Sequence, residues 1–273
     1  MNVFFSLLAT LIIIMLYILF LGNLLVQTLE NFVGFSSAQI NLVAASVMLS
    51  GMVAVTSTSA CMGSLGVAVE DRKESGRDFY TSPIARWKIS VGYIIGAGIV
   101  GLIMTIIALA IVFVYLGSLG GSLPTGGDWG RLALTIVLSS LCANSMMFFL
   151  IMFIKSENAY SGFVSVTSTL MGFLMGIYIP IGIFPEGVQW VSRIFPMSHA
   201  AAMFRQVIAN DALTTLFYGA PDGYLEEFKL LYGVVYRFGD YTSDFWFSAS
   251  ALIIYSAFFF TLSVITMRVR KIS

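Results

Sequence analysis

The stretch Tyr178-Ile-Pro-Ile-Gly-Ile-Phe-Pro-Glu-Gly-Val-Gln-Trp-Val-Ser-Arg-Ile-Phe-Pro-Met-Ser-His-Ala-Ala-Ala-Met-Phe-Arg205 decides the fold. Its prolines divide an apolar sequence into pieces of about ten residues, too short for a helix to cross a bilayer. Lipid cannot hydrogen-bond the backbone groups that such breaks set free, so broken backbone at membrane depth is buried in protein or lines a cavity. We therefore expect short re-entrant helices here, at the end of a pathway.

Composition places the chain among integral membrane proteins. Of its 273 residues 58% are hydrophobic and 10% are charged, with a mean hydropathy of +0.92, whereas a soluble domain has about 25% charged residues. The formal net charge is zero, which argues against a nucleic acid partner. Cys61 and Cys142 both lie in apolar runs, so we interpret them as small core residues and not as disulfide partners.

Six segments are long and apolar enough to cross a bilayer, and they form one transmembrane domain over residues 1–273. We expect an all-α integral membrane protein with six transmembrane helices, in which short re-entrant helices follow the fifth span. An even number of spans places both termini on one side of the membrane. The predicted spans are about 3–26, 40–68, 89–116, 131–154, 162–183 and 246–267.

Basic residues predict the orientation. The loop 69–88 contains five Lys or Arg residues and three more follow the last span, whereas the short loops 27–39 and 117–130 contain none. The positive-inside rule therefore places both termini and the loop 69–88 in the cytoplasm, and the long segment 184–245 outside. The cell membrane of a bacterium is the expected location.

Two spans have faces of small polar residues. Serines recur every seven residues in the second span, and the fifth span repeats the pattern. Such faces have two compatible interpretations, because small residues let helices pack closely and hydroxyls can also line a conduit for a partly polar substrate. The pairs Gly92-xxx-Gly96 and Gly172-xxx-Gly176 have the spacing of close helix crossings. The candidates for lining the pathway are Ser50, Ser57, Ser64, Ser161, Ser165, Ser168 and Gly172.

The cytoplasmic loop 69–88 alternates its five basic residues with four acidic ones. Residues 70–79 are predicted to form a short helix that Gly76 weakens and Pro83 ends. One interpretation is a solvated loop whose cations fix the topology. The other is a docking helix whose mixed charges give a soluble partner its register.

The loop and the broken segment together resemble the membrane subunits of the ABC type-2 transporter family, permeases that work as dimers with cytoplasmic ATP-binding-cassette subunits. The resemblance covers six spans in the family order and depends on Glu70, Glu74, Gly76 and Ser82-Pro83-Ile84, with Gly182-Ile-Phe-Pro185, Pro196 and Arg205 at the outer side. It implies that the loop is a coupling helix for nucleotide-driven motion and that the broken segment forms an outer gate. The implied coupling residues are Glu70, Asp71, Arg72, Glu74, Gly76, Arg77 and Pro83, and the implied gate residues are Pro180, Gly182, Phe184, Pro185, Pro196 and Arg205.

Two features depart from the family pattern. Such permeases usually begin with a basic amphipathic surface helix, whereas Met1-Asn-Val-Phe leads directly into the first span, and the outer insert 211–244 is larger than a minimal family loop. In the outer segment we expect a helix over 197–210, with Arg205 as a lone charge near its end at the membrane interface, and an amphipathic helix over 224–238.

The sequence also limits the chemistry expected of the chain. There is no Gly-x-x-x-x-Gly-Lys-Ser/Thr phosphate loop, so we expect no enzyme activity and no cofactor on this chain, with ATP and Mg²⁺ on the partner subunits. His199 has no Cys or carboxylate neighbour at ligand spacing, so we expect neither a metal site nor catalysis there.

The leading hypothesis is the membrane subunit of an ATP-driven exporter. Two ATP-binding-cassette subunits and a second permease, identical or homologous, would open a path between spans two and five for an amphipathic or hydrophobic drug, lipid or peptide. One alternative is a secondary transporter or channel, which usually holds buried charges near the membrane midplane that these spans lack. Another is a non-transporting scaffold or immunity protein.

Overall fold

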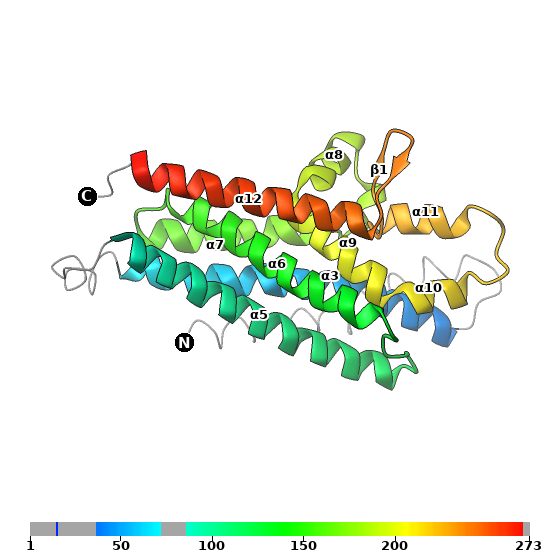
Figure 1. The fold of residues 1–273 in the computed structure, drawn as a ribbon. Helices are drawn as coiled ribbons and strands as arrows, with labels where there is room; N and C mark the ends of the chain where they lie inside the picture. The colour runs from blue at the N-terminus through cyan, green and yellow to red at the C-terminus, as the bar shows by residue number, and fades with distance from the viewer. Residues whose placement is uncertain (1–14, 16–36, 72–85, 270–273) are drawn as a thin grey trace.

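The computed structural model describes Met15, residues 37–71 and residues 86–269, so the first predicted span lies almost entirely outside the described residues. Four described helices are long and apolar enough to cross a membrane, and they match the second, third, fourth and sixth predicted spans. They lie side by side in one bundle (Figure 1). These helices are α3 (Ser37–Glu70), α5 (Arg86–Ser118), α6 (Asp128–Ile151) and α12 (Phe245–Val269).

Helix α3 is the centre of the bundle and contacts α5, α6, α7, α9 and α10. It has no charged residue between Gln39 and Glu70, so none of its faces requires water and nearly its whole length is buried. Small residues let its neighbours approach closely. A Cβ added at Gly101 of α5 would lie only 2.4 Å from the Cys61 Sγ atom. Cys61 and Cys142 are buried free thiols, which confirms the prediction.

Helix α5 approaches its neighbours through different glycines from those predicted. A Cβ at Gly92 or Gly96 would have no described atom within 4 Å, so the predicted crossing at this pair is not formed among the described residues. A Cβ at Gly98 would instead lie 3.0 Å from the Asn144 side chain of α6. Asn144 Nδ2 donates a hydrogen bond to the Ile94 carbonyl at 2.7 Å, which joins the two helices inside the apolar region.

Helix α7 (Glu157–Leu174) corresponds to the fifth predicted span, about 162–183, but it begins and ends earlier. Ser156 caps its start by accepting a hydrogen bond from the Ala159 N–H at 3.2 Å. Its end is set by Gly176, whose φ of +65° reverses the chain direction in a way that glycine adopts readily. The prediction of a span reaching residue 183 is therefore wrong, because residues 175–183 form turns and the short 3₁₀ helix η2 (Ile181–Ile183).

The outer segment contains several short elements, one of which also differs from expectation. The predicted helix over 224–238 is wrong beyond Leu231, because Gly233 adopts a φ of +64° and the Val234 N–H turns back to the Lys229 carbonyl at 2.8 Å. A small antiparallel hairpin follows, with Phe238 paired to Tyr241. The elements are α8 (Glu186–Ile194), α9 (Pro196–Ile208), α10 (Asn210–Leu216), α11 (Tyr224–Leu231), β1 (Arg237–Phe238) and β2 (Tyr241–Thr242).

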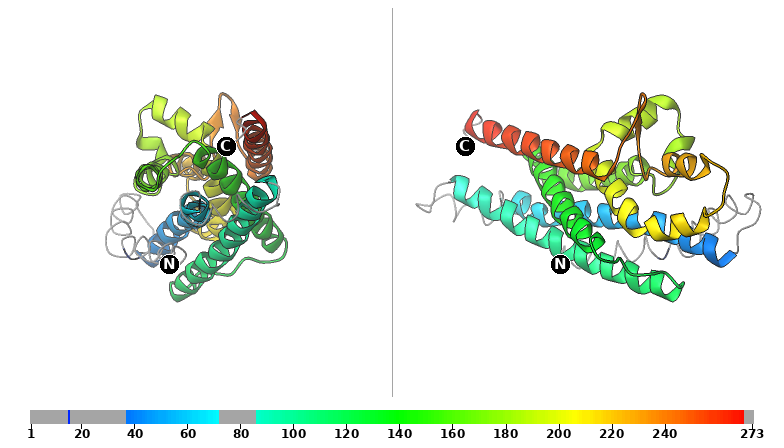
Figure 2. Two further views of the ribbon diagram at one scale, coloured as in Figure 1. Left: turned by 90° about the vertical axis from the view of Figure 1, so that its left-hand side faces the viewer. Right: turned by 45° about the vertical axis from the view of Figure 1, so that its right-hand side comes forward.

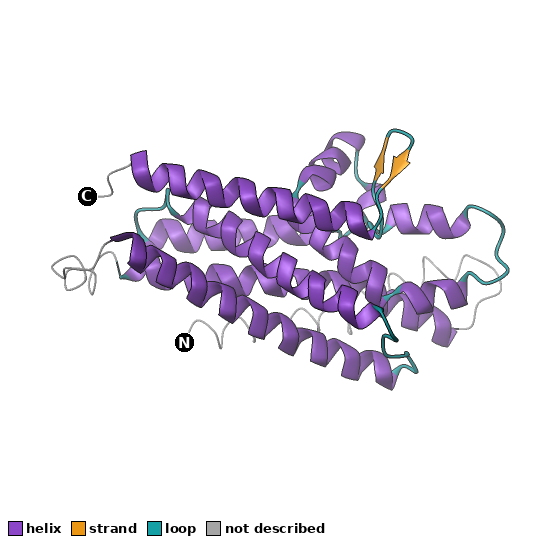
Figure 3. Cartoon of the chain, viewed as in Figure 1, coloured by secondary structure: helices purple, strands orange, loops and turns teal. Residues whose placement is uncertain are grey.

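The views in Figures 1 and 2 agree on how the ends of the bundle are arranged. The end of α3, the start of α5 and the end of α12 lie together at one end of the bundle. The short outer helices and the hairpin gather away from that end, along α9. Helices dominate, and the hairpin is the one strand pair in the described part of the chain (Figure 3).

Candidate functional site

Prolines form the corners of the segment 178–205. Pro180 precedes η2, Pro185 precedes α8 and Pro196 is the first residue of α9. A proline φ near −65° suits a helix start, and the N–H that proline lacks would be unpaired there. The three prolines therefore separate short helices, as the sequence predicts. Pro196 is buried, Pro180 is half-buried and Pro185 is exposed.

Arg205 differs most from expectation. The sequence predicts a lone charge near the end of a helix at the membrane interface, whereas the Arg205 side chain is fully buried in protein, where α9, α3, the end of α7 and the residues after α11 meet. Its guanidinium donates hydrogen bonds to backbone carbonyls on each of these neighbours. Nε bonds Val47 at 3.1 Å, Nη1 bonds Gly233 at 3.3 Å, and Nη2 bonds Met175 at 2.8 Å and Gly176 at 3.2 Å.

Helix ends explain how these carbonyls stabilise a buried cation. Met175 is the C-cap of α7, and Gly233 follows the C-cap of α11, so carbonyls without partners inside their helices point at the guanidinium. The C-terminal end of a helix also has a partial negative charge, which favours a nearby cation. Backbone dipoles thus take the place of a carboxylate around Arg205.

Two glycines leave the space that the guanidinium fills. A Cβ at Gly51 of α3 would lie 2.6 Å from Arg205 Nη2, far inside normal contact distance. A Cβ at Gly233 would lie 3.3 Å from Arg205 Nη1. Gly51 could have been suspected from the sequence, because a glycine within a long helix costs stability and often indicates a close approach.

Further side chains join α9 to the same neighbours. The Ser198 hydroxyl donates to the Leu174 carbonyl at 3.0 Å, at the end of α7. The buried Tyr236 hydroxyl donates to the Ser198 carbonyl at 3.2 Å, and Gln206 Nε2 donates to the Val234 carbonyl at 2.7 Å. Sequence reasoning did not identify Tyr236 or Gln206, since their partners are backbone groups brought close only by the fold. Helix α9 is therefore tied to α7 and to the residues after α11.

The other predicted gate residues lie in η2 and directly after it. A Cβ at Gly182 would lie 2.9 Å from the Leu231 Cα atom, so the absence of a side chain lets η2 pack onto α11. Gln189 Nε2 of α8 donates to the Gly182 carbonyl at 3.2 Å and to the Phe184 carbonyl at 2.8 Å. The structure thus brings Gly182 and Phe184 together under α8, apart from the contacts of Arg205.

The predicted pathway serines of α3 lie inside the chain. Ser50 and Ser57 are completely buried, whereas Ser64 is half-buried. Ser50 Oγ donates to the Val47 carbonyl at 2.9 Å, and the Ser57 and Ser140 hydroxyls form a hydrogen bond of 3.2 Å between α3 and α6. Within one chain this face packs helices together, and its role in lining a path stays a prediction.

Two of the predicted pathway residues of α7 face outward. Ser161 and Ser165 are exposed and Ser168 is half-buried, whereas a Cβ at Gly172 would clash with the Tyr178 ring at 2.0 Å. The two polar faces therefore do not face each other within one chain. A path lined by both faces stays a prediction.

Two predicted coupling residues are described. Glu70 is the exposed last residue of α3, and Asp71 follows it and accepts a hydrogen bond from the Tyr93 hydroxyl of α5. The Tyr160 hydroxyl of α7 donates to the Met62 carbonyl of α3, so three helices are joined near this end. The other predicted coupling residues, Arg72, Glu74, Gly76, Arg77 and Pro83, lie outside the described residues.

His199 is a buried residue whose ring contacts neighbouring helices. Its side chain is buried in α9, with Nε2 at 3.0 Å from the Arg193 carbonyl and Nδ1 at 3.5 Å from the Ser248 hydroxyl of α12. Since a carbonyl only accepts, the Nε2 atom carries the proton. Burial lowers the pKa of His199 to about 4. The neutral ring thus joins α8, α9 and α12.

Comparison with known proteins adds one finding. A family model described as ABC-2 family transporter protein matches residues 23–265 of the chain. That range includes the four long helices up to residue 265 and all of the outer segment. No curated protein and no solved structure matches the chain.

Proposed function

We propose that this chain exports an amphipathic or hydrophobic substrate. A drug, a lipid or a peptide fits this description. The chain belongs to the ABC-2 family of transporter proteins and is a permease component of an ABC transporter. Two permeases form the path, either two copies of this chain or this chain and a homologue. Two separate cytoplasmic ATPase subunits hold ATP and Mg²⁺ and supply the energy, in the membrane of a bacterial cell.

The contact between α3 and Arg205 is the observation that supports this mechanism. Helix α3 ends at Glu70 beside the proposed coupling loop, and toward its other end the Val47 carbonyl accepts a hydrogen bond from Arg205. ATP binding brings the ATPase subunits together and displaces the coupling loops. The movement then passes along α3 to Arg205 and so to the ends of α7 and α11, a two-state rearrangement of rigid elements driven by a ligand.

The polar faces support the substrate class. Residues 158–174 of α7 contain no acidic or basic side chain, and the exposed hydroxyls of Ser161 and Ser165 lie among apolar residues. A wall of hydroxyls and apolar groups suits a substrate that is partly polar and not highly charged. In a pair of permeases the exposed α7 faces supply the part of the wall that one chain leaves open.

Reconstitution with the cognate ATPase tests this function. We expect ATP-dependent export from vesicles that contain both proteins, and loss of export with retained ATP hydrolysis after Glu70→Lys, because the reversed charge disrupts docking. Glu226→Lys, an exposed change of the same kind on the outer helix α11, is the control and should leave export unchanged. Full transport by this chain alone would contradict the proposal.

A further inference from the structure

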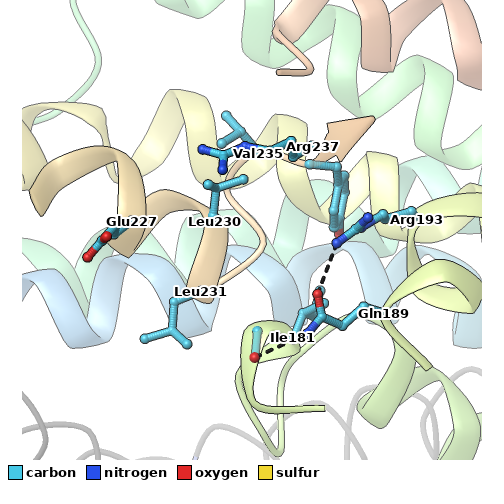
Figure 4. Close-up of a pocket in the computed structure, with 10 residues that line it drawn as sticks. Ile181, Gln189, Arg193, Glu227, Leu230, Leu231, Val235 and Arg237 are labelled. Carbon is cyan, nitrogen blue, oxygen red and sulfur yellow. Dashed lines mark hydrogen bonds between the residues drawn. The ribbon is translucent and has the colours of Figure 1, made fainter. Parts of the chain in front are cut away.

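A pocket of about 310 Å³ lies between η2, α8 and the residues from α11 to β1 (Figure 4). Its walls include the apolar side chains of Ile181, Leu230, Leu231 and Val235. Three charged side chains, Arg193, Glu227 and Arg237, also line it. The pocket therefore combines an apolar surface with a net positive charge.

The two arginines are available for an anionic ligand. Among the described residues the ion pair found is Arg131–Asp128, far along the chain from this pocket, so neither Arg193 nor Arg237 is neutralised by a described carboxylate. Glu227 lies at the opposite end of the pocket from Arg193 (Figure 4). Positive charge is thus not cancelled at the Arg193 end.

Arg193 is held in place for such a role. Its Nη2 atom donates to Gln189 Oε1 at 2.9 Å, one turn earlier in α8. Its guanidinium also lies over the Trp190 ring, 5.2 Å from the ring centroid. These contacts order the side chain before a ligand arrives and leave further N–H groups of the guanidinium for a ligand, so less entropy is lost on binding.

Helix α8 packs beside the membrane-spanning helix α12. Its Ile194 carbonyl accepts a hydrogen bond of 2.7 Å from the Tyr255 hydroxyl of the membrane-spanning helix α12. Val188, Trp190, Val191 and Ile194 of α8 are exposed, whereas Gln189 and Arg193 line the pocket. An amphipathic helix beside a span can turn its apolar face to lipid and its cationic side chains toward polar groups.

We propose that this pocket binds the phosphate head group of an amphiphile, with a phospholipid of the outer membrane surface as its occupant. A guanidinium matches a phosphate with two parallel hydrogen bonds, which Arg193 can supply, and Arg237, which also lines the pocket, adds positive charge. The apolar walls then contact the glycerol and the first methylene groups. This binding needs no ATPase and does not depend on the proposed export.

Titration calorimetry in lipid-free detergent tests the site with three probes. These are dihexanoyl phosphatidylglycerol, dihexanoylglycerol without the head group, and inorganic phosphate. We expect the phospholipid to bind more tightly than either other probe, because only it offers both the anion and the apolar part. The double change Arg193→Gln and Arg237→Gln should raise the Kd for the phospholipid at least tenfold. A tenfold change in Kd corresponds to about 1.4 kcal/mol, roughly the contribution of one charge-assisted hydrogen bond.

Arg131→Gln is the matched control, since it removes an arginine that does not line the pocket. It should leave phospholipid binding unchanged. Arg237→Gln alone, at an exposed position, should also weaken binding, which keeps the test valid if changing Arg193 disturbs α8. Equal binding by the wild type and both glutamine variants would overturn the site. Inorganic phosphate or the uncharged glycerolipid binding as tightly as the phospholipid would overturn the proposed occupant.

Discussion

Replacing Arg205 by methionine is the most direct test of the polar centre in the outer segment. The change keeps an unbranched side chain but removes four hydrogen bonds, made to the carbonyls of Val47, Met175, Gly176 and Gly233. Each buried group left without a partner costs about 1–3 kcal/mol. Because methionine also removes the cost of burying a cation, we expect a net loss of about 3 kcal/mol in the free energy of unfolding. For a chain of this size that corresponds to a fall of roughly 6–12 °C in Tm.

Gly51→Ala approaches the same contact from α3. The new Cβ would lie 2.6 Å from Arg205 Nη2, so we expect it to displace the guanidinium and to cost about 1–3 kcal/mol. In the Arg205→Met background the clash is relieved, so the two changes should be less than additive by about 1 kcal/mol or more. Gly92→Ala, where the Cβ meets open space, is the control and should stabilise α5 by about 0.5–1 kcal/mol.

Thermal unfolding of the purified protein in detergent, followed by intrinsic fluorescence, measures all four variants. Two results would refute the reasoning. One is a Tm for Arg205→Met that stays close to that of the wild type. The other is an equal cost of Gly51→Ala in both backgrounds, which would mean that Gly51 and Arg205 do not interact.

Two further changes give predictions of different kinds. Burial lowers the pKa of His199 to about 4, whereas the pKa in the unfolded chain is about 6.5. The unfolded chain therefore binds a proton first as the pH falls below 6.5. Between pH 6.5 and 4 the free energy of unfolding should fall by up to about 3 kcal/mol. His199→Gln should flatten this part of the Tm profile between pH 4 and 8, and an unchanged slope would contradict the assignment. Ser165→Leu on the exposed face of α7 should reduce ATP-dependent export in vesicles without lowering Tm, whereas Ser57→Leu should lower Tm because Ser57 is buried against Ser140. Unchanged export by the Ser165 variant would count against a path along α7.

Features that depend on local chemistry could be predicted from the sequence. Proline at 180, 185 and 196 fixes its own φ and removes its own N–H whatever surrounds it, so the breaks lie where the sequence places them. Long apolar runs likewise gave four of the spans to within a few residues, because length and hydropathy are properties of the segment alone.

Features that depend on distant partners could not be predicted. A glycine can adopt a positive φ or continue a helix, so the sequence did not show that Gly176 would end α7 or that Gly233 would end α11. The sequence shows Arg205 only as a lone charge near the end of a predicted helix. Its carbonyl partners come from three separate parts of the chain.

Because α3 is long, a small tilt at its Glu70 end causes a large displacement where it contacts Arg205. The helix rises about 1.5 Å per residue, so the Val47 carbonyl lies roughly 35 Å along the axis from Glu70. If the helix pivots near Glu70, a tilt of about 3° moves that carbonyl sideways by nearly 2 Å. A hydrogen bond of 3.1 Å does not survive such a displacement. Small angular changes at one end are therefore amplified at the other, where Arg205 must either follow α3 or bond a different carbonyl.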